Sequence, residues 1–134
     1  NQGSAYVFVR KNASWSQQQK LFAGDGAAND GFGNSVAVSG ATVVVGAGLD
    51  DIAANPDQGS AYVFVRSETN WSQQAKLIAG DGGSGDNFGI SVAIGGDTLV
   101  VGAERDTIGA NLDQGSVYTF VRSGASWSQQ TKLT

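Results

Sequence analysis

Carboxylates are the side chains of this sequence with the widest chemistry open to them, because it contains no histidine and no cysteine. Ten of its twelve acidic residues fall in two groups that lie one after the other along the chain. These groups are Asp25, Asp30, Asp50, Asp51 and Asp57, and then Asp81, Asp86, Glu104, Asp106 and Asp113. Carboxylate oxygens ligate hard cations such as Ca²⁺, pair with basic groups of a partner, or act as general acids and bases.

Catalysis is the least favoured of these roles. A glycosidase needs its two carboxyl groups about 5–10 Å apart across a cleft, and sequence neighbours such as Asp50 and Asp51 on a loop do not provide that geometry. The missing histidine and cysteine also exclude Ser-His-Asp and Cys-His mechanisms and zinc sites built on imidazole or thiolate. The sequence therefore predicts a protein that is not an enzyme, with no catalytic residues.

Charge and hydropathy restrict the partners further. The 134 residues contain 8 basic and 12 acidic side chains, and a net charge of −4 argues against a nucleic-acid partner. No run approaches the roughly 20 apolar residues that cross a bilayer, so no membrane span is expected. The chain begins at Asn1 without a methionine or a signal-like segment, which we interpret as a mature or excised segment.

The second group with potential chemistry consists of three tryptophans spaced 56 residues apart, Trp15, Trp71 and Trp127. Flat indole faces suit pyranose rings, and a repeated platform is typical of a multivalent lectin. However, the surrounding sequence repeats with the same period: residues 2–10 recur unchanged at 58–66. A period of this length indicates a propeller, solenoid or array, so packing at the blade edge is the favoured interpretation of the tryptophans.

One repeat contains four strand-like runs separated by turn signals, at residues 33–38, 42–47, 60–66 and 71–78. In the third run the aromatic residues Tyr62 and Phe64 alternate with aliphatic ones, so both faces of the sheet must be covered. The fourth run is polar, as expected of an outer strand. The sequence therefore predicts an all-β fold of four-stranded antiparallel β-propeller blades.

The order of these runs predicts about two and a half blades. Residues 2–22 form a half blade with strands three and four, and residues 32–78 and 88–134 form full blades. Propellers typically have about 4–8 blades, so the terminal sheets are expected to have open faces. We therefore expect a piece of a larger propeller, a ring-forming oligomer or a filament subunit, with further copies of the chain among its partners.

Three motifs in order resemble one known repeat. Phe32-Gly33 and Phe88-Gly89 open the units, Gly46-Ala47 and Gly102-Ala103 end the second strands, and residues 59–64 form a third strand. Their combination is similar to the FG-GAP repeat, the blade of integrin-α-type β-propellers and of many bacterial surface proteins. The resemblance implies an extracellular or cell-surface, secreted protein that binds protein partners through the loops of one rim.

The resemblance also implies where calcium would bind, between the first and second strands of a blade. The family often has an Asp-x-Asp-x-Asp-Gly loop there, whereas this chain has only residues 39–41 and 95–97, with at most one carboxylate. We therefore expect no cofactor and no metal at the family's usual site. A calcium site improvised from the rim loops is left open.

The blade topology places all ten acids on the same rim. For Asp25, Asp57, Asp81 and Asp113 we favour ordinary turn chemistry, because Asp stabilises tight turns through its own backbone. Asp50, Asp51 and Asp106 belong to a longer variable loop, so they are stronger candidates for binding a cation or a partner than the other acids, although turn chemistry remains the favoured interpretation here too. Phe32, Gly33, Phe88 and Gly89 are interpreted as structural residues that permit close approach of the blades.

The leading functional hypothesis is adhesion or protein–protein assembly through this acidic rim. One alternative is a purely structural or self-assembling array in which the blade faces make the contacts. The other is a lectin-like propeller with a glycan partner.

Overall fold

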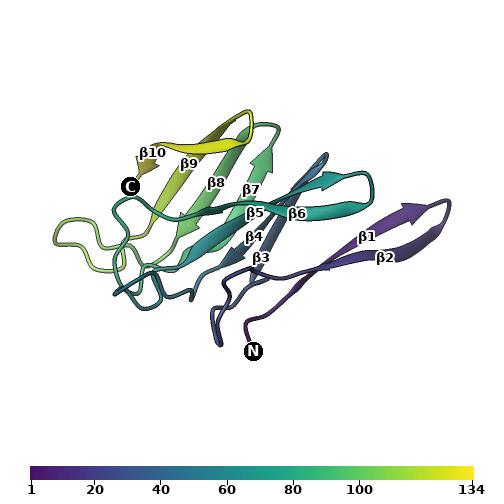
Figure 1. Ribbon diagram of the computed structural model, residues 1–134. Helices are drawn as coiled ribbons and strands as arrows, with labels where there is room; N and C mark the ends of the chain where they lie inside the picture. The colour runs from purple at the N-terminus through teal and green to yellow at the C-terminus, as the bar shows by residue number, and fades with distance from the viewer.

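The computed structural model describes all 134 residues, which form ten β-strands and no helix (Figure 1). The first sheet pairs β1 (Ala5–Lys11) with β2 (Ser14–Leu21). The second contains β3 (Ser35–Ser39), β4 (Thr42–Ala47), β5 (Ser60–Ser67) and β6 (Asn70–Leu77). The third contains β7 (Phe88–Gly95), β8 (Thr98–Ala103), β9 (Ser116–Ser123) and β10 (Ser126–Leu133).

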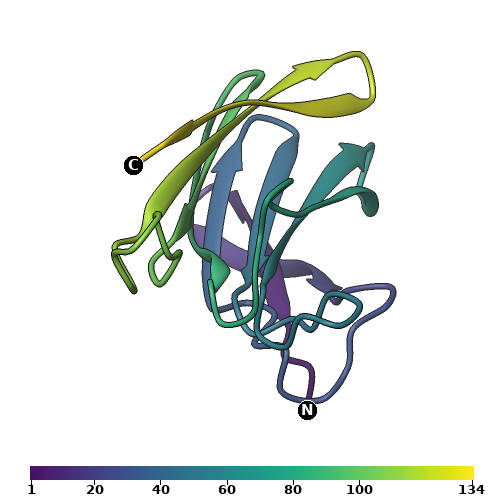
Figure 2. The same ribbon diagram turned by 90° about the vertical axis from the view of Figure 1, so that its left-hand side faces the viewer.

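All neighbouring strands are antiparallel, and each sheet follows the order of the chain. The three sheets lie face to face as consecutive blades, as Figures 1 and 2 both show. The predicted all-β class and the four-stranded blades are thus confirmed. The two-stranded sheet at the N-terminus corresponds to strands three and four of a blade, because β1 and β2 share the register and the bulge of β5 and β6.

The first strand of the second blade begins at Ser35, two residues later than predicted. Phe32 donates its N–H to the Gln2 carbonyl of the preceding blade at 2.9 Å instead of joining its own sheet. Gly33 follows with φ of +98°, in the left-handed region that favours glycine. The Phe-Gly pair is therefore a contact between blades, and the regular strand starts only after it.

Two apolar clusters fill the spaces between the blades. Because both faces of β5 are apolar, Tyr62 and Phe64 pack toward the first blade and Val63 packs toward the third. Phe32 meets the ring of Tyr62 edge to face at 5.4 Å between centroids, and Phe88 meets Tyr118 in the same way at 5.3 Å. The hydrophobic core is thus interblade, and each blade needs a neighbour to bury its faces.

A β-bulge repeated in each outer strand pair directs a glutamine at the next blade. Gln18 lies opposite no residue of β1, and Gln74 occupies the same place in the second blade. Gln18 accepts the indole N–H of Trp71 at 2.8 Å, and Gln74 accepts that of Trp127 at 3.0 Å. Trp71 is 7% exposed, whereas Trp15, which has no such glutamine partner in the structure, is 67% exposed.

The two terminal blades have open faces. Tyr6 of β1 is 50% exposed, while Tyr62 at the same repeat position is fully buried. At the other end, Val117 and Leu133 of the third blade are exposed, although their counterparts Ala61 and Leu77 belong to the interblade core. This difference arises from the missing neighbours, since the local sequences are nearly the same.

Candidate functional site

The acidic loops meet along one edge of the blades. They are the β4–β5 and β8–β9 connections (residues 48–59 and 104–115) and the links between blades (Figure 1). Gly85 of a link donates to the Pro56 carbonyl at 2.9 Å, and Asn87 donates to the Asp57 carbonyl at 3.1 Å. Each link is thus attached to the loop of the preceding blade. We call this edge the acidic rim, made of the ten acids named above.

Asp50 lies inside the rim rather than on it. Its side chain is nearly inaccessible, and its Oδ2 accepts hydrogen bonds from Ser60 Oγ and, at 2.8 Å, from the Tyr62 hydroxyl. The Lys76 ammonium lies 2.9 Å from the same oxygen. Ser60 and Tyr62 are on β5 and Lys76 is on β6, so two strands enclose this carboxylate.

Asp25 joins this cluster from the preceding link. Its Oδ1 accepts from the Tyr62 hydroxyl at 2.9 Å, and its Oδ2 lies 2.7 Å from Lys76 Nζ. The ammonium also lies 5.3 Å from the centre of the Tyr62 ring, close enough for a cation–π contact. One lysine therefore bridges two carboxylates, one in the link between the first two blades and one in the β4–β5 loop of the second blade.

The third blade repeats the cluster 56 residues later. Ser116 donates to Asp106, and the Tyr118 hydroxyl donates to Asp106 at 3.0 Å and to Asp81 at 2.9 Å. Lys132 Nζ lies 2.7 Å from Asp106 and 2.8 Å from Asp81. We call these two groups the Asp-Tyr-Lys clusters.

The pKa shifts are those of paired ions. Burial by itself would raise the pKa of Asp25, but hydrogen bonds from Lys76 and Tyr62 outweigh it and lower the pKa. For Lys76, burial opposes charge, yet the bonds to the two carboxylates raise its pKa above the ordinary lysine value. Burial raises the pKa of Tyr118 to about 12. The pKa shifts of Asp25, Lys76 and Tyr118 each favour the charge state that these groups already have at neutral pH, unlike those of an acid–base pair poised for catalysis.

Asp30 and Asp86 are also buried, and they stabilise the blade links. Asp30 accepts from the Ala27 N–H, and Asp86 accepts from the Gly83 N–H at 2.6 Å. Each closes a turn by bonding backbone three residues earlier. Burial raises the pKa of Asp86, because these bonds do not fully replace water.

The remaining four rim acids are exposed to solvent: Asp51, Asp57, Glu104 and Asp113. Asp51 accepts from the Asp57 N–H at 2.9 Å, and Asp57 adopts a φ of +51°, as Asp113 does. Arg105 lies 3.7 Å from Asp113, and both are more than half exposed, so water weakens this pair. Asp25 and Asp81 are exposed as well, but their oxygens are already bonded to lysine and tyrosine. The four carboxylates listed above are the exposed ones outside the Asp-Tyr-Lys clusters.

Asp50 and Asp106, which were candidates for binding on a variable loop, are therefore buried residues in the structure. The loop does run over the surface, but each of these aspartates turns inward to a serine, a tyrosine and a lysine. Asp25 and Asp81 also do more than close turns, because they bridge blades. The sequence does contain a sign of these clusters, because Lys20, Lys76 and Lys132 recur at the repeat period together with the tyrosines.

The three tryptophans differ in whether a neighbouring blade covers them. Trp71 and Trp127 donate to glutamines of the preceding blade and lie beside the guanidinium groups of Arg66 and Arg122. Only Trp15 presents most of its surface to solvent. Sugar stacking by all three indoles is incompatible with this packing.

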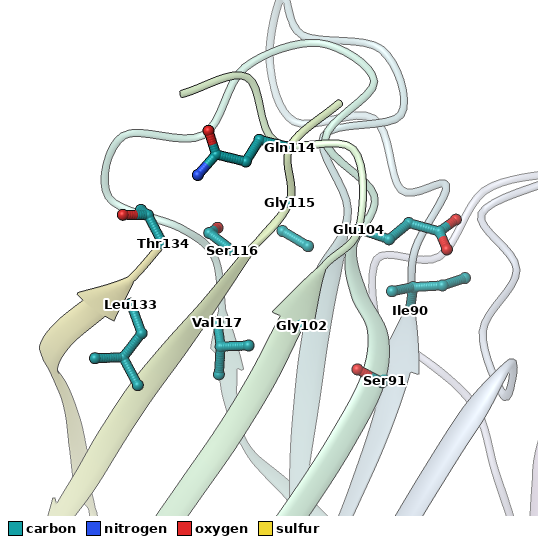
Figure 3. A pocket seen from close by; sticks show the side chains of 11 residues that line it. Ile90, Ser91, Gly102, Glu104, Gln114, Gly115, Ser116, Val117, Leu133 and Thr134 are labelled. Atoms are coloured by element: carbon teal, nitrogen blue, oxygen red, sulfur yellow. The ribbon is translucent and has the colours of Figure 1, made fainter. Parts of the chain in front are cut away.

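No three of the rim acids converge in a metal-binding geometry. Glu104 is the one rim acid that lines a pocket, on the open face of the third blade (Figure 3). The other two pockets lie between the first two blades, and one of them is lined wholly by apolar residues, Tyr6, Phe8 and Val38 among them. The structure contains no apolar helix of membrane-spanning length.

Comparison with protein families agrees with the repeat. The FG-GAP repeat model matches residues 15–64 and 71–120, which together make up more than half of the chain. A comparison with curated proteins gave no match. FG-GAP repeats commonly form non-enzymatic β-propeller modules for adhesion or protein interaction, and they are typical of extracellular or surface proteins. With the Phe-Gly contacts and the four-stranded blades in place, the chain belongs to the FG-GAP repeat family.

Proposed function

We propose that this chain is a non-enzymatic module of an extracellular or cell-surface β-propeller, which binds a protein partner through its acidic rim for adhesion or assembly. The observation that carries the proposal is the division of the ten rim acids. Six are held by lysine, tyrosine or serine or close the turn of a blade link. The other four are exposed on neighbouring loops and have no lysine, tyrosine or serine partner. An exposed carboxylate without a strong partner is available to a second molecule.

The chemistry of the exposed acids suggests a basic partner surface. Asp51 and Asp57 belong to one loop, and Glu104 and Asp113 to the next. Lysine or arginine side chains of a partner would pair with them, and such rim charges mainly accelerate association and set orientation. The binding should therefore weaken as salt concentration rises.

The test replaces the four exposed acids by their amides, as Asp51→Asn, Asp57→Asn, Glu104→Gln and Asp113→Asn. Asparagine tolerates the left-handed conformation at positions 57 and 113, so the fold should be retained. We expect protein-coated beads to adhere at least about tenfold less to a panel of immobilised extracellular proteins, because most of the rim charge is lost.

The matched control is Glu68→Gln, which removes an exposed acid in the β5–β6 turn at the other end of the blade. It should adhere like the unmodified protein. If the fourfold amide variant still adheres equally well, the proposal of rim binding is wrong. That result would support the structural-array alternative, in which the open blade faces make the contacts. That alternative is favoured by the exposed Tyr6, Phe8 and Leu133.

We also propose that the module works without calcium. The ammonium groups of Lys76 and Lys132 lie between the rim carboxylates, where a cation would otherwise bind. The melting temperature should be the same with millimolar calcium and with chelator, since a ligand specific for the native state would raise it by mass action. A calcium-dependent increase measured by differential scanning calorimetry would contradict this proposal.

A further inference from the structure

The strand ends opposite the acidic rim carry charges of the other sign. This end consists of the turns that join β1 to β2, β3 to β4, β5 to β6, β7 to β8 and β9 to β10 (Figure 1). Its charged residues are four basic and two acidic ones, Arg10, Lys11, Arg66 and Arg122, and Glu68 and Asp97. We call this end the basic rim, and its net charge is 4 − 2 = +2.

The charges of the chain are therefore separated along the strands. The ten acids of the acidic rim share their end with four basic residues, Lys20, Lys76, Arg105 and Lys132, so its net charge is 4 − 10 = −6. Lys76 and Lys132 are bonded within the Asp-Tyr-Lys clusters and leave the exposed acids to solvent. The molecule thus has a negative end and a positive end.

The two ends do not neutralise each other within one molecule. Asp57 precedes β5, and Arg66 lies near the last residue of that strand. The segment from Ser60 to Arg66 spans about 20 Å at the rise of an extended strand. This length is roughly twice the Debye length of about 10 Å at 0.1 M salt. Each end therefore acts on other molecules as a separate surface.

Most cations of the basic rim have no carboxylate partner. Arg10, Lys11 and Arg66 are exposed, and none of them takes part in an ion pair of the structure. The guanidinium of Arg66 lies 5.8 Å from the centre of the Trp71 ring, a contact that positions the group but leaves its charge. Only Arg122 is paired, with Asp97 at 2.7 Å. Three cations are therefore available to an acidic partner.

The cations and the acids recur with the same spacing. Asp57 and Asp113 precede the third strands of two blades at equivalent positions, and Arg10 and Arg66 lie near the ends of third strands. Each pair is one repeat apart, so the rotation from blade to blade that separates the acids also separates the arginines. A second copy placed end to end would therefore present its arginines with the angular spacing of the acids.

We propose that the basic rim binds the acidic rim of a second copy of this chain, so that molecules associate end to end. The inference rests on the proposed function, because it names the partner of the same acidic rim. The contact uses strand ends and turns, and it is distinct from the packing of apolar blade faces. Two acidic rims or two basic rims repel each other, so charge favours the head-to-tail order alone.

Sedimentation velocity tests this association in the unmodified chain. At about 20 mM NaCl the weight-average sedimentation coefficient should rise with protein concentration. The association should weaken at least about tenfold at about 300 mM NaCl, because ions screen charges at exposed surfaces. Association that is equally strong at both salt concentrations would overturn the proposal, since apolar contacts between open blade faces are not screened in this way.

Two variants identify the surfaces that meet. The basic-rim variant neutralises the three unpaired cations, as Arg10→Gln, Lys11→Gln and Arg66→Gln. Its counterpart is the fourfold amide variant of the acidic rim described above. Neither should self-associate, because each lacks one of the two surfaces. Their equimolar mixture should form dimers and nothing larger, since the intact basic rim of one variant binds the intact acidic rim of the other. Dimers in the mixture also show that both variants are folded.

A control for net charge adds three acids away from both rims. Gln17, Ser72 and Thr131 are exposed residues of the outer strands, one in each blade. Replacing all three by glutamate lowers the net charge by three, as the basic-rim variant does. This control should self-associate within about twofold of the unmodified chain, because charges away from a contact are largely screened.

Three results would overturn the proposal. One is a basic-rim variant that still self-associates, and another is a mixture that stays monomeric. The third is an unmodified chain that does not self-associate while the fourfold amide variant still loses adhesion to other proteins. In that case acidic-rim binding stands and only its assignment to a second copy fails. If such a chain is retained on heparin through the three cations, the basic rim binds a sulfated glycan instead.

Discussion

Replacing Lys76 with methionine is expected to lower the free energy of unfolding by about 3 kcal/mol, as for removal of one partner of a buried ion pair. The substitution leaves the buried Asp50 facing Asp25 with no ammonium between them. Methionine keeps most of the side-chain volume, so the loss reports on charge rather than on a cavity. Urea denaturation followed by tryptophan fluorescence measures the change.

The matched control is Lys20→Met, at the same repeat position of the half blade. Lys20 lies 5.6 Å from the Tyr6 ring but has no carboxylate partner. Its replacement should change stability by less than about 0.5 kcal/mol, as is usual for surface substitutions. If both variants are equally stable, the Asp-Tyr-Lys cluster contributes nothing beyond an exposed lysine.

Acid should weaken the same clusters. The pKa values of Asp25, Asp81 and Asp106 are lowered in the fold. A carboxyl with a lowered pKa stabilises the fold above its unfolded pKa, ordinarily 3.8, and the contribution is lost as pH falls through the folded value. Protonation of Asp86 has the opposite effect and favours the folded state, because burial raises the pKa of this carboxyl. Unfolding free energy should thus fall below pH 3.8, and less steeply in the Lys76→Met variant.

Gly89→Ala is expected to destabilise the fold at least as much as Lys76→Met. Gly89 has a φ of +96°, and a Cβ there would overlap the Ser60 carbonyl oxygen of the neighbouring blade. Backbone strain costs about 1–3 kcal/mol, and overpacking a tight contact costs about 1–3 kcal/mol more. Thermal unfolding by circular dichroism should show the loss, because the second and third blades must separate to admit the methyl group.

Gly95→Ala provides the control within the same strand. Gly95 is not in the left-handed region, and a Cβ there would meet no atom within 4 Å. Its melting curve should match that of the unmodified protein. Equal stability of the Gly89→Ala variant would show that the blades are not in close contact at the Phe-Gly pair.

Most of the fold followed from local patterns. The run at residues 42–47 matches β4 in both bounds, because β-branched residues between turn signals suit a pleated strand wherever it lies. The start of β3 was harder to predict from the sequence. Phe32 bonds to Gln2 of another blade, and no local pattern indicates that bond.

The acids were harder to interpret than the strands. Asp50 and Asp51 are neighbours with the same chemistry, yet one is 4% exposed and the other faces solvent. Their difference depends on Tyr62 and Lys76, which approach Asp50 only when β5 and β6 pair. A carboxylate's environment is set by groups far from it in sequence, so spacing alone does not separate a buried anchor from a binding residue.

The sequence by itself determined the family and the four strands of a blade, because a period of 56 residues and alternating apolar positions are local properties. Only the tertiary structure decided which acids stabilise the blades and which remain available to a partner. The reason is that burial and ion pairing arise where blades meet. Six of the ten acids are held by such contacts or by the turns of the blade links, and the other four lie exposed on the rim.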